Sequence, residues 1–208
     1  MIRHQRPALI LFTILILPAM VISGCGGSSN RTPTDTVTCM SFVPTQGPAA
    51  GFVAAEVDAS STCETLVLNM MVTEVDDLWS AGATVRFPIN LMNFVGVSSS
   101  GSVLNEGGID VVVSGDRPCP EGGTDWCQPL GQFYGEVSIG ITRSSGVASG
   151  VDVGAASQRL LQLSFTKAFG NGTTTLSFPS GTNLFDGQRP PQAILPAPAW
   201  VGGTVTVN

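Results

Sequence analysis

Short stretches in which apolar and polar residues alternate recur along most of the chain, and glycine, proline and small polar residues separate them. In Tyr134–Arg143, for example, Val137, Ile139 and Ile141 alternate with more polar neighbours. This period of two is typical of strands that bury one face, and helical spacing is almost absent. The pattern predicts an all-β sandwich of roughly nine strands, over residues 52–58, 65–75, 82–87, 91–97, 109–115, 134–143, 159–168, 173–178 and 200–207. Only 147–158 and 183–187 allow a short helical turn.

The first part of the chain has a different pattern. Arg3 and Arg6 precede a fifteen-residue apolar stretch, Ala8–Ile22, which Thr13 and Pro18 interrupt. This stretch is shorter than a membrane-spanning helix requires and has the length of the apolar region of a secretory signal. Residues 1–24 are therefore expected to be a signal peptide.

The signal ends in Ile22-Ser23-Gly24-Cys25, which resembles the lipobox of bacterial lipoproteins. The resemblance implies that the chain is cut before Cys25, whose sulfur carries a diacylglycerol, and that the acylated residue anchors the protein to a lipid bilayer of a bacterial cell envelope. Two or more acyl chains hold a protein stably without a spanning helix. By the same analogy, Gly26 in place of Asp favours the outer membrane. The alternative is a signal peptide that contains a cysteine by chance.

The predicted mature chain is acidic and contains no histidine. Removal of residues 1–24 takes away Arg3, Arg6 and His4, the only histidine, and leaves seven basic against 15 acidic side chains. Because there is no basic patch to neutralise phosphates, nucleic-acid binding is not expected. Residues 25–36, with the lipidated cysteine, are small and polar and are expected to form a flexible tether, while 37–208 have the size of one domain.

The four remaining cysteines form an even set in an exported chain, which favours two disulfides. Three pairings are possible. The most economical joins Cys119 to Cys127 and Cys39 to Cys63. Loop entropy gives these bonds a stabilisation of roughly 2.5 and 3.5 kcal/mol respectively.

The sequence offers little support for catalysis. Without histidine, Ser-His-Asp and Cys-His mechanisms are excluded and the commonest zinc ligand is missing. Ser164–Lys167 matches the S-x-x-K motif, but it lies in a predicted strand, where positions three apart point to opposite sides. A polysaccharide hydrolase with paired carboxylates, or a calcium site, is a weaker alternative that would draw on Glu74, Asp76, Asp77, Asp116, Glu121 and Asp125. No metal or cofactor is expected.

Aromatic side chains suggest one place for a ligand. Trp126 lies inside the predicted Cys119–Cys127 loop beside Asp125, and Tyr134 follows a few residues later. A rigid loop that displays a tryptophan can stack on a sugar or contact a protein partner. Alternatively, Trp126 folds back over the edge of the core. Trp79 and Trp200 flank strands and are expected to fill the core.

The order of the predicted strands resembles a cohesin-type domain, a jelly-roll-like β-sandwich related to certain carbohydrate-binding modules. The likeness runs from about Gly51 to Val207. Where many cohesins carry an aromatic-Asp-Pro turn, this chain has Phe87-Pro88-Ile89-Asn90, and the dockerin-contacting residues cannot be placed. The segments that carry the likeness are LVLNMMVTEVDDLWSAGATVRF, LMNFVGVSSSGSVLN, YGEVSIGIT, RLLQLSF, GTTTLSF and WVGGTVTVN.

Together these features predict a non-catalytic, lipid-anchored envelope protein that recognises a carbohydrate or a surface or secreted protein, in a setting linked to polysaccharide use. The alternative is a structural subunit whose edge strands pair within a larger envelope assembly.

Overall fold

The computed structural model describes residues 39–105, 109–117, 133–144, 149–179, 183–188, 190–197 and 199–208. All of them belong to the compact unit Thr36–Asn208. The predicted signal peptide, Cys25 and the tether lie outside the described residues. Within the part that is described, no helix is both long and apolar enough to cross a membrane.

The described residues are folded almost entirely as strands, as the alternating pattern predicts. One 3₁₀ turn, η1, spans Val103–Asn105. The strands are β1 Met40–Pro44, β2 Phe52–Val57, β3 Thr65–Val72, β4 Val75–Pro88, β5 Met92–Ser98, β6 Ile109–Arg117, β7 Tyr134–Arg143, β8 Val151–Val153, β9 Gln158–Lys167, β10 Gly172–Leu176, β11 Asn183–Asp186, β12 Ala199–Val201 and β13 Gly203–Val207.

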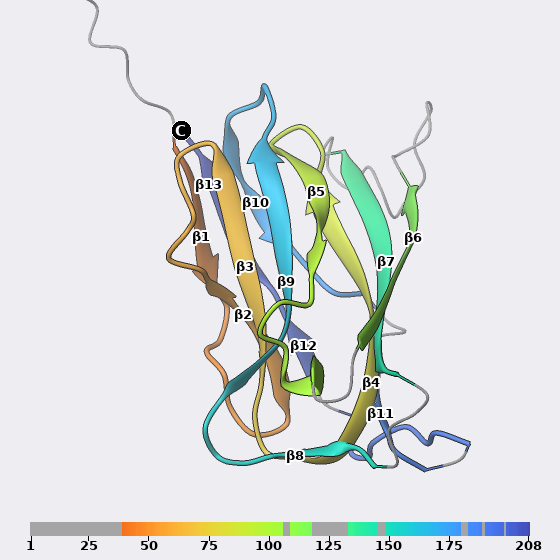
Figure 1. Cartoon of the computed structure of the whole chain (residues 1–208). Coiled ribbons are helices and arrows are strands. Elements are labelled where there is room, and N and C mark those ends of the chain that lie inside the picture. Colours follow the sequence, from red (N-terminus) through yellow and green to blue (C-terminus); the bar gives the residue numbers. More distant parts are fainter. Residues whose placement is uncertain are drawn as a thin grey trace, which may run out of the picture. The chain divides into compact units, whose positions relative to one another are not determined.

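These strands form the two layers of a sandwich (Figure 1). One layer has the order β12-β2-β3-β9-β5. The other contains β11-β4-β7-β6, with β8 beside β4, and the sheet β1-β13-β10, which an antiparallel bridge between Arg86 and Ser177 joins to β4. Neighbours are antiparallel except for β12 and β2. The predicted all-β, jelly-roll-like sandwich is confirmed.

Apolar side chains from both layers meet in one core. Phe87 on β4 packs against Phe94 on β5 and Phe165 on β9, with ring centroids 6.2 and 5.6 Å away. Burying an aromatic side chain of this kind stabilises the fold by about 2–3 kcal/mol. Trp200 is buried against Phe178, as expected for a residue that fills the core.

Trp79 does not fill the core, contrary to the sequence expectation. Its side chain is only half-buried, and the inward-pointing residue beside it is Leu78. The pairing of β11 with β4 passes from Ser80 to Leu78 without a partner for Trp79, so Trp79 is the extra residue of a β-bulge. The bulge changes which residues face inward, and local alternation does not reveal it.

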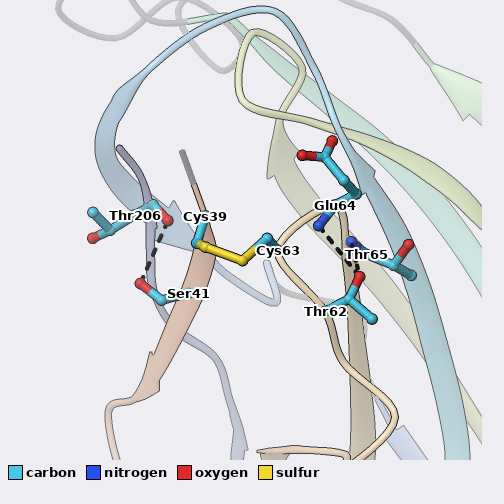
Figure 2. Close-up of a disulfide and its surroundings, with 7 residues drawn as sticks. All are labelled: Cys39, Ser41, Thr62, Cys63, Glu64, Thr65 and Thr206. Atoms are coloured by element: carbon cyan, nitrogen blue, oxygen red, sulfur yellow. Dashed lines mark hydrogen bonds between the residues drawn. A yellow bond between two sulfur atoms is a disulfide. The ribbon is translucent and has the colours of Figure 1, made fainter. Parts of the chain in front are cut away.

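One predicted disulfide is present. Cys39 and Cys63 are bonded (Figure 2). The backbone N–H of Met40 also donates to the carbonyl of Cys63 at 3.0 Å. The bond ties the first described residue to the turn before β3. The predicted pair Cys119 and Cys127 lies outside the described residues.

Several predicted boundaries were wrong. The stretch 65–75 does not form one strand, because the chain turns at Glu74, whose φ of +51° lies in the left-handed region. Strand β4 therefore begins at Val75 and includes the predicted strand 82–87. The stretch 200–207 divides at Gly202, where the chain passes from one layer to the other and an added Cβ would lie 2.0 Å from the carbonyl oxygen of Leu176.

The two expected helical turns were also wrong. The stretch 183–187 contains strand β11, and 147–158 contains strand β8 and the first residue of β9. Strand β1 was not predicted at all. These three strands are five residues long or shorter, so they contain too few alternations to be distinguished from loops.

Candidate functional site

The outward side of β4 and β7 is a regular surface of small and hydroxyl-bearing residues. Side chains at alternate positions of both strands, such as Val85 and Ile139, point into the core. The residues between them point outward and form four directly paired rows, which we call the β4–β7 face: Ser80 with Thr142, Gly82 with Gly140, Thr84 with Ser138, and Arg86 with Glu136. All eight are half-buried.

A hollow of about 220 Å³ lies toward one end of this face, over its first two rows. Gly82 and Gly140 stand directly opposite each other, so two neighbouring positions lack a side chain and the backbone forms the floor. Ser80, Thr142 and Phe185 line the sides, and Phe185 comes from the adjacent strand β11. The hollow therefore combines an exposed backbone, two hydroxyl groups and one aromatic ring.

Polar contacts fix the side chains at the other end of the face. The Thr84 and Ser138 hydroxyls share a hydrogen bond of 3.3 Å. The Nε and Nη2 atoms of Arg86 donate to Oε1 of Glu136 at 2.9 and 2.7 Å. A partly exposed ion pair contributes only about 0–1 kcal/mol to stability. The ion pair nevertheless fixes the positions of both long side chains, which meet between β4 and β7.

Of the three predicted ligand-binding residues, the structure describes Tyr134 alone. Tyr134 is buried, with 7% of its surface exposed, and its hydroxyl shares a 2.7 Å hydrogen bond with that of Thr174. Its ring is therefore enclosed by the fold and offers no free face for stacking on a ligand. Trp126 and Asp125 lie outside the described residues.

The carboxylates considered for catalysis have different surroundings. Oδ1 of Asp77 accepts the backbone N–H of Gly150 at 2.8 Å, and Oδ2 accepts that of Gly187 at 3.1 Å. Asp77 therefore joins β4 to the segments beside β8 and β11. Glu74 and Asp76 are exposed beside a hollow of about 310 Å³.

The remaining candidates are less informative. The backbone of Asp116 lies in β6, and Glu121 and Asp125 lie outside the described residues. Among the residues that are described, no three His, Cys, Asp or Glu side chains are grouped as metal ligands. Ser164 and Lys167 lie in strand β9, as predicted.

A separate polar cluster surrounds Asp58, at the end of β2. The side-chain hydroxyl and the backbone N–H of Ser60 donate to Oδ1 of Asp58 at 2.6 and 2.9 Å, and Nδ2 of Asn69 donates to Oδ2 at 2.8 Å. These bonds, with a smaller contribution from Arg159, lower the pKa of Asp58 from 3.8 to about 2. Asp58 is thus a hydrogen-bonded carboxylate and not a proton donor near neutral pH.

The residues of the hollow were not predicted from the sequence. A usable signal was present, because Gly82 and Gly140 interrupt two otherwise regular strand patterns. Glycine inside a strand weakens the strand and often marks a place where another chain or a ligand comes close to the backbone. No comparable local signal identified Phe185, which belongs to an unpredicted strand.

Comparison with known proteins gives a likeness of fold. No family model matches the chain, and no curated protein matches it. Solved structures similar to it include a type II cohesin domain from the cellulosome of Acetivibrio cellulolyticus, with 12% identity and a TM-score of 0.47 over 81% of this chain and 94% of that one.

Two further cohesins are similar. A non-cellulosomal cohesin from the archaeon Archaeoglobus fulgidus has 12% identity and a TM-score of 0.41, over 80% of this chain and 88% of that one. A cohesin from a type I cohesin–dockerin complex of Clostridium thermocellum has 9% identity and a TM-score of 0.44, over 80% and 96%. Cohesins are also the family whose strand order the sequence resembles.

Proposed function

We propose that this chain is a non-catalytic binding module of a bacterial cell envelope, anchored through acylated Cys25, that docks a protein partner on the β4–β7 face. The observation that carries the proposal is the hollow over the Gly82–Gly140 pair. It lies in a flat face, and the surrounding side chains offer hydroxyl groups and one aromatic ring.

The composition of this face suits a protein surface. Its serine and threonine side chains are short, so binding immobilises few rotatable bonds. Their hydroxyls can donate and accept hydrogen bonds in several directions. An apolar side chain of the partner can enter the hollow and contact Phe185, as an anchor residue does at the centre of many interfaces.

Gly82 offers a direct test of the face. A Cβ added at this position would have only the carbonyl oxygen of Ile139 in its neighbourhood, at 4.0 Å, so a side chain can be added without a clash. Gly82→Arg should fill the hollow and abolish partner binding while leaving the unfolding midpoint nearly unchanged. The control is Gly96→Arg on β5 of the other layer, where nothing lies within 4 Å of an added Cβ.

The measurement is capture of envelope proteins by the acylated chain, followed by mass spectrometry and an affinity measurement with each purified partner. A dockerin module is a suitable first probe, since one accompanies the cohesin in the Clostridium thermocellum complex. The expected result is binding by the unaltered protein and the Gly96→Arg variant only. Equal binding by Gly82→Arg would exclude this face as the docking surface.

The carbohydrate interpretation has a different test. It depends on Trp126 and Asp125, so Trp126→Ala should remove glycan binding on an array while Gly82→Arg leaves it intact. Glycan binding that Gly82→Arg abolishes and Trp126→Ala preserves would instead assign the β4–β7 face to a saccharide.

Anchoring is tested separately by metabolic labelling with palmitate. The label should appear in the unaltered protein and vanish in Cys25→Ser. A Cys25→Ser chain that still carries the label would contradict the proposed anchor.

A further inference from the structure

Phe169, in the connection between β9 and β10, is a fully exposed aromatic side chain on a fixed backbone. The residue before it, Ala168, donates its backbone N–H to the carbonyl of Leu91 at 2.9 Å. The residue after it, Gly170, donates to the carbonyl of Asn90 at 2.8 Å, and a Cβ added at Gly170 would lie 2.3 Å from that oxygen. Both neighbours of Phe169 are therefore bonded to the β4–β5 turn. These bonds fix the backbone at Phe169, and its ring remains exposed to water.

Phe169 lies at the end of the domain where the described chain begins. The Cys39–Cys63 disulfide directly precedes Glu64 (Figure 2). The backbone N–H of Lys167 donates to the carbonyl of Glu64 at 2.9 Å. In the sheet beside it, Val207 is paired with Met40 on one side and with Gly172 on the other. Glu64, Lys167, Ala168 and Phe169 also line one hollow of about 290 Å³. We call this region the Cys39 end.

The segments around Phe169 differ in charge from those around β8. In the described residues 39–41, 62–65, 88–93, 166–173 and 206–208, Glu64 and Lys167 are the only ionisable side chains. The end of β6 and the start of β7 also reach this end of the domain, because Tyr134 is paired with Pro88. The segments 73–77 and 150–154, at the start of β4 and around β8, carry four carboxylates and no lysine or arginine: Glu74, Asp76, Asp77 and Asp152. Strand β4 runs from this acidic region to Pro88, near the Cys39 end.

We propose that the Cys39 end rests on the lipid bilayer and that Phe169 inserts its ring into the boundary between headgroups and acyl chains. The inference depends on the proposed anchor at Cys25. Residues 26–38 are then the whole connection between the acyl chains and the disulfide. A flexible segment of this length has an average span of about 20 Å, so the Cys39 end is the part of the domain held nearest the membrane.

Two physical effects favour this contact between the Cys39 end and the bilayer. An aromatic ring gains free energy when it moves from water into the interfacial region, and a ring on a rigid loop loses little entropy in doing so. Anionic lipids repel carboxylates, which disfavours the region around Glu74, Asp76, Asp77 and Asp152 as the side that faces the bilayer. Because the acyl chains already provide the attachment, Phe169 fixes the orientation of the domain.

The test uses the full acylated chain in cells, with the photo-crosslinker p-benzoylphenylalanine in place of Phe169. The matched control has the same substitution at Leu195, which is 81% exposed and lies beside Glu74 and Asp76. Mass spectrometry then identifies what is attached at each position. We expect lipid adducts at position 169 in about tenfold excess over position 195, because both positions carry the same aromatic group and only position 169 is placed at the bilayer interface by the proposal. Both variants should keep the unfolding midpoint of the parent.

The remaining outcomes overturn the proposal in distinguishable ways. Palmitate on Cys25 without lipid adducts at position 169 would exclude the orientation but leave the anchor intact. Absence of palmitate would remove the anchor and this inference together. Adducts at position 169 to another protein, or to a second copy of this chain, would show that Phe169 belongs to a protein interface.

Discussion

At the residue scale, the hydrogen bonds around Asp58 stabilise its charged form. The two donors of Ser60, then Asn69, outweigh the effect of desolvation and hold the pKa of Asp58 at about 2, below the ordinary value of 3.8. A carboxylate whose pKa is lower in the folded state stabilises the fold at pH values above the unfolded pKa. Its contribution should therefore be complete above pH 4 and disappear as the pH falls through about 2.

A carboxyl-carbon NMR titration of the folded chain checks the pKa of Asp58 directly. Unfolding of the Asp58→Asn variant checks its consequence, since stability between pH 4 and pH 2 should fall less steeply than in the parent. The half-buried Glu56, on strand β2, provides the control as Glu56→Gln. A midpoint near 4 for Asp58 would mean that the bonds from Ser60 and Asn69 do not persist in solution.

At the scale of elements, Asp77 is a single side chain that connects three strands. Its carboxylate accepts two backbone N–H groups, and its own N–H donates to Oδ1 of Asp152 on β8 at 2.9 Å. Asp77→Ala leaves the N–H groups of Gly150 and Gly187 without this acceptor and should lower the free energy of unfolding by about 1–3 kcal/mol.

The neighbouring Asp76 is exposed and gives a matched control, because Asp76→Ala should change stability by less than about 0.5 kcal/mol. Denaturant unfolding of both variants measures the two changes in unfolding free energy. Equal effects would mean that the loss of charge, and not the loss of the bonds to Gly150 and Gly187, determines the result.

Some strands could be predicted from the sequence and others could not. Strands such as β7 and β9 were predicted because ten residues give several alternations. Strands β8 and β11 are held by pairing with β4 and by Asp77, whose partners are 73 and 110 residues away, so local pattern cannot reveal them. Alternation also places Tyr134 outward with Glu136, but Thr174 on β10 helps to enclose it. The glycines of the β4–β7 face were visible but had no assigned role.

At the scale of the whole molecule, the Cys39–Cys63 disulfide closes a loop over a sequence separation of 24 residues that contains β1 and β2. Among the described strands, β1 occupies one edge of its sheet and pairs with β13 alone, so it gains most from a covalent link to the turn before β3. The double variant Cys39→Ala/Cys63→Ala should lose about 3.5 kcal/mol of unfolding free energy, chiefly because the unfolded chain becomes less restricted.

Urea unfolding of this double variant with and without reductant then examines the second predicted bridge, Cys119–Cys127. Once Cys39 and Cys63 are absent, any further loss caused by reductant has to come from another disulfide, and loop entropy predicts about 2.5 kcal/mol for this one. The alternative pairings, which would join Cys39 or Cys63 to the later cysteines, leave Cys119 and Cys127 each without its partner in the double variant. Insensitivity to reductant would therefore show that these two thiols are free, whereas a loss of the predicted size requires that the pair forms independently of the bond at the Cys39 end.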